Sequence, residues 1–224
     1  MTNGDPATER RVRYDQGCAA AHALNLVGDR WALLVVRELM LTPKRFQAIR
    51  AGLPGITPGV LAGRLEQLAD AGIVTHDPDT SFYALTGDGY ALRPVLRELG
   101  RWGAGRLGHD PRRFLSPTSL MMSLAVMADR GRTAGSRAFA GFDLGRERFL
   151  VCFDADGEPE VQPTRDPGAA PLTFEGAPNA VAFALYGPRS VADLMAAGSV
   201  TVRGDAAAAQ EFADLFGSVN LAEV

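Results

Sequence analysis

Residues 53–74 of the 224-residue chain read LPGITPGVLAGRLEQLADAGIV. Residues 53–55 predict a tight turn. Thr57 followed by Pro58 is typical of a helix start, because threonine caps free backbone amides and proline is preorganised for the first helical position. Apolar residues at helical spacing then predict a helix over residues 58–71 that ends at Gly72; they are Val60, Leu61, Leu65 and Leu68.

The segments on either side of this stretch complete a recognisable order. Upstream we expect helices over residues 18–27 and 30–40, the second capped by Asp29, and a short helix over residues 44–50. Downstream, residues 73–76 and 82–85 are short β-type runs around a turn at 77–81, and a helix over 87–103 follows. Helix, helix, short helix, turn, helix, hairpin, helix is the order of a winged helix-turn-helix.

In such a fold one helix enters the DNA major groove, which is about 12 Å wide. The helix over residues 58–71 is the predicted reader, with Arg64 and Gln67 contacting bases and nearby cations holding phosphates. The predicted DNA-binding residues are Lys44, Arg45, Arg50, Thr57, Pro58, Gly59, Gly63, Arg64 and Gln67. The alternative from the pattern alone is that these are simply exposed positions of a helical domain.

The second half of the chain differs in charge and in periodicity. Residues 1–115 contain 15 cationic and 12 acidic residues, whereas residues 116–224 contain 8 and 14. The pattern predicts a helix over 118–129, strand-like runs between 137 and 174, two short helices, a strand at 200–203 and a last helix over 206–216. We therefore expect an α+β chain with a flexible tail (1–16), a winged helix-turn-helix domain (17–107), a linker (108–117) and a second α+β domain (118–224).

The first half resembles the HxlR-type winged helix regulators of the wider MarR-like group. The matching segments are Leu26–Leu34, Arg37–Leu39, Pro43–Phe46, Leu53–Pro58, Ala71–Val74, Tyr83–Thr86, Leu92–Val95 and Trp102–Gly103. The resemblance implies a DNA-binding homodimer in which the first helix and the helix after the wing form the interface. The residues that this places at the interface are Leu24, Val27, Leu96, Leu99 and Trp102. The wing tip, residues 77–81, is acidic where the family usually has basic residues, which argues against phosphate contact there.

The second half resembles a sterol-carrier-protein-type domain. The resemblance rests on a helix rich in Met and Leu, on Leu185–Gly187, on Ala196–Asp205 and on Phe212–Phe216. It implies an apolar ligand bound between the sheet and the helices. The residues expected to line that cavity are Met121, Met122, Phe139, Phe149, Phe153 and Phe183, although the same side chains could simply fill a core.

Other functional classes find no support in the sequence. No apolar run is long enough for a membrane span, and neither a secretory signal nor a disulfide framework is present, so we expect a cytoplasmic protein with no membrane partner. No nucleophile, phosphate-loop or dinucleotide motif occurs, and the three histidines and two cysteines have no metal-ligand spacing, so we expect no enzyme activity, no cofactor and no metal. Cys18, at a helix start, is either a redox switch or a small residue at the dimer interface.

The sequence therefore predicts a homodimeric transcriptional regulator that binds operator DNA and whose second domain senses an apolar small molecule. The alternative is a protein that binds lipids or small hydrophobic molecules and uses its winged helix for protein contacts. An enzyme built on the second domain is a third possibility, which no group of residues supports.

Overall fold

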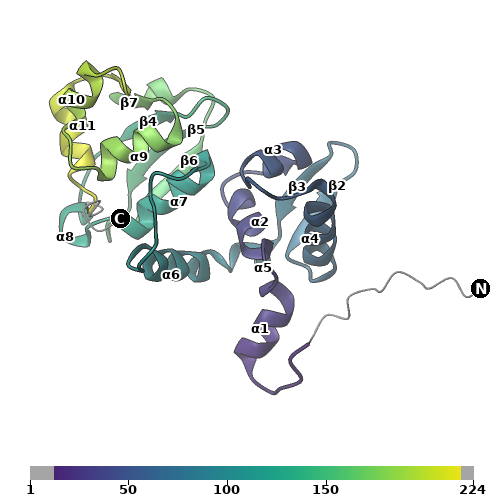
Figure 1. The fold of residues 1–224 in the computed structure, drawn as a ribbon. Helices are drawn as coiled ribbons and strands as arrows, with labels where there is room; N and C mark the ends of the chain where they lie inside the picture. The colour runs from purple at the N-terminus through teal and green to yellow at the C-terminus, as the bar shows by residue number, and fades with distance from the viewer. Residues whose placement is uncertain (1–12, 218–224) are drawn as a thin grey trace, which may run out of the picture.

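The computed structural model describes residues 13–217, so most of the predicted tail (1–16) lies outside the described residues. Two separate hydrophobic cores organise these residues, one in each half of the chain. Figure 1 shows the helices and strands of the two halves as two groups. We call the half from α1 to α6 the winged helix domain, and the half from α7 to α11 the C-terminal domain.

The winged helix domain has the predicted order of elements. Its core is formed chiefly by α2 and α4, with fully buried side chains such as Val35, Leu39 and Leu61. The three strands form a small antiparallel sheet in the order β1-β3-β2. The elements are α1 (Ala19–Val27), α2 (Ala32–Leu39), β1 (Lys44–Arg45), α3 (Phe46–Ala51), α4 (Pro58–Asp70), β2 (Val74–Asp77), β3 (Phe82–Leu85), α5 (Gly87–Tyr90) and α6 (Arg93–Ala104).

Two local predictions in this half were wrong. Asp29 does not cap α2; Trp31 occupies that position with a φ of 80°, and the Asp29 carboxylate pairs with Arg64 instead. The single helix expected over 87–103 is two helices. Pro94 explains the break, because its ring excludes the carbonyl group four residues earlier, that of Tyr90, from helical geometry.

The C-terminal domain is a five-stranded sheet packed against helices. The strand order is β6-β5-β4-β7-β8, with β4 and β7 parallel and the other neighbours antiparallel. Side chains from α7, α9 and α11 share one core with the sheet. The elements are α7 (Pro117–Met127), α8 (Arg130–Thr133), β4 (Ala140–Asp143), β5 (Arg148–Phe153), β6 (Pro159–Pro163), the 3-10 turn η1 (Pro167–Ala169), β7 (Leu172–Glu175), α9 (Pro178–Tyr186), α10 (Val191–Ala196), β8 (Thr201–Arg203) and α11 (Ala206–Ala213).

The space between α7 and the sheet, where the sequence places an apolar ligand, is filled by side chains. The ring of Phe212 lies 5.9 Å from that of Phe174 and 6.0 Å from those of Phe142 and Phe153. Phe149 is 1% exposed and belongs to this packed core, and its role in lining a cavity stays a prediction.

The other predicted lining residues lie at different places. Met121 and Met122 border a pocket of about 500 Å³ between α6, α7 and β6, outside the core. Phe183 borders a pocket of about 340 Å³ on the outer side of α9. Phe139 and Phe153 are partly buried and line neither pocket.

A buried polar cluster joins the two domains. The Lys44 ammonium donates to Glu147 Oε1 and Thr118 Oγ1, each at 2.7 Å, and to Glu38 Oε2 at 3.3 Å. Glu38, which is fully buried, also accepts from Ser116 Oγ at 2.7 Å and from Arg37 at 2.8 Å. Glu38 and Lys44 come from the winged helix domain and the other hydroxyl and carboxylate groups from the C-terminal side, so the cluster fixes one domain on the other.

Candidate nucleic-acid interface

Helix α4 is set at a fixed angle by the turn before it. Gly55 has a φ of +90°, a conformation that glycine adopts without steric cost. Thr57 Oγ1 then accepts a hydrogen bond from the Val60 amide at 3.4 Å, as predicted for a helix cap. Leu61, Leu65 and Leu68 are buried against the domain core, so the opposite face of α4 points away from it.

The exposed face of α4 lacks side chains over its first two turns, at Gly59 and Gly63, and carries the exposed carboxylates of Glu66 and Asp70 further along the helix. We call the part at Gly59 and Gly63 the bare face. A Cβ atom built on Gly59 or Gly63 meets no heavy atom within 4 Å, so neither glycine is required by packing inside the chain. Each glycine costs about 1 kcal/mol of helix stability relative to alanine. A close approach of the backbone at these two glycines to a DNA groove stays a prediction.

Arg64 is held within its own domain. Its Nη1 atom lies 2.6 Å from Asp29 Oδ2, and the same nitrogen donates to Gln67 Oε1. The arginine side chain is 22% exposed. To contact a base, Arg64 has to give up the Asp29 pair, so base reading by Arg64 and Gln67 stays a prediction.

Replacing Arg64 with alanine tests that prediction. If Arg64 reads a base, Arg64→Ala weakens specific DNA binding by about 1–3 kcal/mol, or roughly 5- to 150-fold, and relaxes the preference at one base pair. Competition binding with single-base operator variants measures both effects. A variant that folds and gives an unchanged footprint would remove Arg64 from base reading and leave it as a support for α4.

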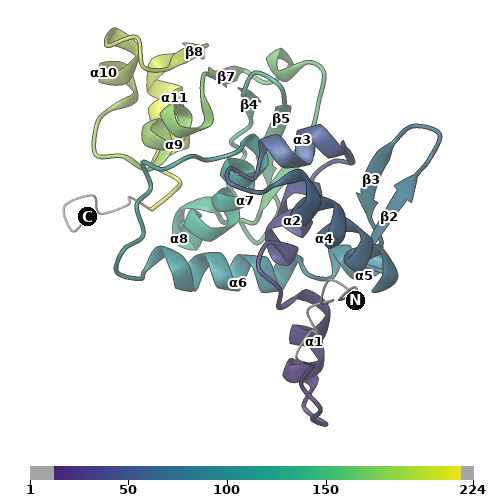
Figure 2. The same cartoon turned by 45° about the vertical axis from the view of Figure 1, so that its right-hand side comes forward.

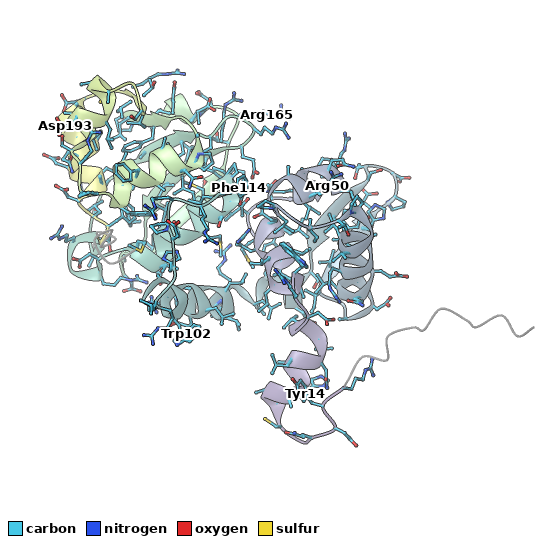
Figure 3. The ribbon with its side chains drawn as sticks, in the orientation of Figure 1. Tyr14, Arg50, Trp102, Phe114, Arg165 and Asp193 are labelled. Atoms are coloured by element: carbon cyan, nitrogen blue, oxygen red, sulfur yellow. The ribbon has the colours of Figure 1, made fainter. Side chains whose placement is uncertain are left out.

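Arg45 and Arg50 remain available for phosphate contacts. Both are exposed, and Arg50 donates only to Gln47 Oε1 at 3.2 Å among the interactions of the described residues. Arg45 stacks over the Phe82 ring at 5.0 Å and donates to the Thr80 carbonyl, in the turn at the wing tip. Figure 3 shows Arg50 at the outer surface of the winged helix domain.

Lys44 cannot hold a phosphate in this arrangement, which corrects the sequence prediction. It is 4% exposed, and its ammonium is surrounded by the carboxylates of Glu38 and Glu147. Lys44 is the single lysine among 23 cationic residues. A lysine ammonium is compact and directs its three donors to acceptors arranged around it. An arginine guanidinium is planar and directs its donors within one plane.

The acidic wing tip has a structural role. The Asp77 carboxylate accepts hydrogen bonds from the Thr80 hydroxyl at 2.6 Å and the Asp79 amide at 2.9 Å. These bonds hold the pKa of Asp77 below its ordinary value, so the turn keeps a negative charge near neutral pH. Weak phosphate contact at this tip stays a prediction, since Arg45 donates to the Thr80 carbonyl of the same turn.

Two helices expose apolar side chains that no other part of residues 13–217 covers. No residue of α6 is fully buried, and Leu99 and Trp102 are 47% and 65% exposed. On α1, which projects from the domain in Figure 2, Leu24 is 52% exposed. Val27 is buried in the domain core and Leu96 packs against that core, so Val27 in particular is not free for the interface predicted for it.

Cys18 sits at the start of α1 and differs sharply from Cys152. Hydrogen bonds from the amides of Ala21 and Ala20 lower the pKa of the exposed Cys18 thiol. Burial and the neighbouring Glu160 raise the pKa of Cys152. At any pH near neutrality, Cys18 therefore carries more of the reactive thiolate.

We expect Cys18 to be alkylated several-fold faster than Cys152 near neutral pH, because the thiolate is the reacting form. Iodoacetamide labelling followed by peptide mass spectrometry measures the two rates. The Cys18→Ser variant should retain only the slow thiol. A fast thiol in that variant, or equal rates in the wild type, would contradict the assignment.

The comparison with known proteins places this domain in a family. The HxlR-like helix-turn-helix family matches residues 26–111. The regulator YvaP of Bacillus subtilis is 38% identical over 85 residues, which cover 36% of this chain and 79% of YvaP. The chain belongs to the HxlR-like helix-turn-helix family. Its winged helix domain is the shared part, and the C-terminal domain lies beyond the matched residues.

Two solved structures are similar to parts of this HxlR-like chain. The quinone-bound YodB of B. subtilis is 37% identical with a TM-score of 0.35, and the match covers 37% of this chain and 92% of YodB. The ubiquinone synthesis protein UbiJ-SCP2 is 16% identical with a TM-score of 0.33, covering 56% and 92% of the two chains. Within residues 13–217, no helix is long and apolar enough to cross a bilayer, and no three metal-binding side chains cluster.

Proposed function

We propose that this HxlR-like protein is a homodimeric regulator that reads operator DNA with α4 and responds to an apolar small molecule through its C-terminal domain. The observation that carries the proposal is the bare face of α4, with open space at Gly59 and Gly63, in a domain that also exposes Arg45 and Arg50. The helix-turn-helix regulators among its relatives support the same role. The domain limits expected from the sequence, 17–107 and 118–224, are part of this proposal.

The experiment that separates this function from the alternative is a salt titration of DNA binding. A protein that neutralises several phosphates loses affinity steeply as salt rises, because bound counterions are released from the DNA. A lipid-binding protein that uses its winged helix for protein contacts has no such dependence. Absence of DNA retention at about 50 mM salt would favour the alternative.

The dimer is proposed to form through the exposed apolar faces of α1 and α6. Trp102→Glu should shift the protein to monomer at micromolar concentration, because it places a charge in an apolar contact. Sedimentation velocity measures the change. Ala104→Glu is the control, since two residues rotate a helix by about 200° and place it on the other side of α6. A wild type that is monomeric yet protects two half-sites would contradict the proposal.

The sensing role rests on the requirement that an effector prefer one dimer geometry, since only differential affinity shifts an equilibrium. The expected coupling is about 1–3 kcal/mol, or 5- to 150-fold in DNA affinity. Titration of fatty acids, sterols and aromatic polyketide-like compounds against operator affinity tests it. Tight binding with constant operator affinity would leave storage or stabilisation as the role of the C-terminal domain.

A further inference from the structure

A hollow of about 750 Å³ lies where the two domains meet. One wall comes from β1, α3 and Phe82 at the start of β3. The other wall comes from Phe114 and Leu115 before α7 and from the turn between β4 and β5. We call this hollow the joint pocket. Its volume falls in the range of small-molecule sites, which often lie between domains.

The walls of the joint pocket expose aromatic rings from both sides. Phe114, on the segment that leads into α7, is 56% exposed, and Phe82 is 36% exposed. Figure 3 shows Phe114 on the side of the C-terminal domain that faces the winged helix domain. Leu144, just after β4, also lines the pocket but is 5% exposed and belongs chiefly to the core of the C-terminal domain. The pocket therefore offers apolar contacts at Phe114, and at Phe82 an aromatic ring over which the Arg45 guanidinium stacks.

The charged groups of the pocket favour an anion. Its ionisable lining residues are Lys44, Arg45, Arg146 and Glu147. Lys44 and Glu147 pair with each other at 2.7 Å, so their charges offset. Arg45 bonds to a neutral carbonyl, and Arg146 makes no ion pair with the described residues. Two guanidinium groups therefore remain for a negatively charged ligand.

We infer that the joint pocket binds a small apolar organic anion, with its apolar part against Phe82 and Phe114 and its anionic group paired with Arg45 and Arg146. This inference rests on the proposed effector response and moves the effector site from the core of the C-terminal domain to the boundary between the domains. The pocket beside Phe183 is the weaker site, since it is smaller and, with Arg112 paired to Asp110 at 2.8 Å, it offers one cation without a described ion pair, Arg189, where the joint pocket offers two.

The position of the joint pocket gives a bound anion a route to the DNA-reading elements. Ala48 and Ala51 of α3 line the pocket, and α3 immediately precedes the turn that sets α4. Phe82 lies on the wing strand β3 and pairs with Arg45 of β1 in the sheet. A ligand that contacts both domains is most stable at one relative placement of them, which is the condition for coupling.

The test uses two fluorescent probes that share an apolar body and differ in charge. They are 1-anilinonaphthalene-8-sulfonate, an anion, and N-phenyl-1-naphthylamine, which is neutral. Titrated into the full chain, the sulfonate should bind saturably at one site per chain. Arg146→Ala should weaken sulfonate binding about fivefold, the upper end for a partly exposed ion pair, and leave the neutral probe unchanged.

The second part of the experiment uses a substitution that fills the pocket. Ala48 is exposed on α3 and lines the pocket, whereas its neighbour Gln47 is exposed and does not. Ala48→Trp should reduce binding of both probes about tenfold or more by occupying the apolar space, and Gln47→Trp should leave both unchanged. Circular dichroism melting shows whether each variant remains folded.

Wild-type affinity for the sulfonate in both Arg146→Ala and Ala48→Trp, or no saturable binding to the wild type, would overturn the inference. Operator affinity measured with and without saturating sulfonate is a separate readout. If the variants change probe binding as expected but saturating sulfonate leaves operator affinity unchanged, the binding site is supported and its regulatory role is rejected. If the wild-type protein binds no DNA at all, the proposed function is rejected, whereas the probe result still decides whether the pocket binds an anion.

Discussion

Replacing Lys44 with methionine is expected to destabilise the protein by about 3 kcal/mol. Breaking a buried ion pair by removing one partner typically costs about 3–5 kcal/mol, because the other charge stays buried. Glu38 is fully buried, but Arg37 and Ser116 still bind it, which places the expected cost at the lower end of that range. Chemical denaturation at neutral pH measures the loss.

Two variants sharpen this prediction. Arg50→Met removes an exposed cation from the adjoining helix α3, and should change stability by less than about 0.5 kcal/mol. Lys44→Arg keeps the charge but should recover only part of the stability, because a planar guanidinium cannot direct donors to Glu38, Thr118 and Glu147 together. Equal stability of Lys44→Met and Arg50→Met would show that the cluster does not join the domains.

Placing a carboxylate on the bare face of α4 is expected to remove DNA binding. Gly63 has open space around its missing Cβ, so Gly63→Glu should fold, yet its negative charge would meet the phosphates of the groove. We expect a loss of about 100-fold or more in operator affinity, measured by fluorescence anisotropy.

Two controls separate charge from position in this experiment. Gly63→Ala adds a methyl group at the same place, and should stabilise the helix by up to about 1 kcal/mol with a much smaller effect on DNA affinity. Ala192→Glu adds the same charge at an exposed position of α10 in the C-terminal domain. If Gly63→Glu binds DNA like Ala192→Glu, then α4 is not the reading helix.

The winged helix could be predicted from the sequence because its signals are local. Thr57 and Pro58 determine the start of α4 within adjacent residues, and the turn at 77–81 determines the hairpin. The family resemblance added the arrangement of these elements around the reading helix. Boundaries failed at two places: at the start of α2, where Arg64 pairs with the expected cap Asp29, and between α5 and α6, where Pro94 interrupts the expected helix.

The joining cluster and the packed C-terminal core could not be predicted in the same way. Nothing near residue 44 in the sequence indicates that its ammonium meets Thr118 and Glu147, because the contact depends on how two domains pack. The signal in the sequence was that residue 44 is the single lysine among 22 arginines. Likewise, the Met and Phe pattern in the sequence is compatible with either a cavity or a packed core. In the structure, the Phe212 ring of α11 packs against Phe142 and Phe174 in the core.

Footprinting on the DNA upstream of the protein's own gene tests the central claim most directly. A twofold dimer whose α4 helices enter successive major grooves should protect two half-sites whose centres lie about 34–36 Å apart. Protection should fall steeply between about 50 and 200 mM salt and should disappear with Gly63→Glu but not with Ala192→Glu. Protection that persists with Gly63→Glu, or no preference for this DNA over an unrelated duplex of equal length, would contradict the account.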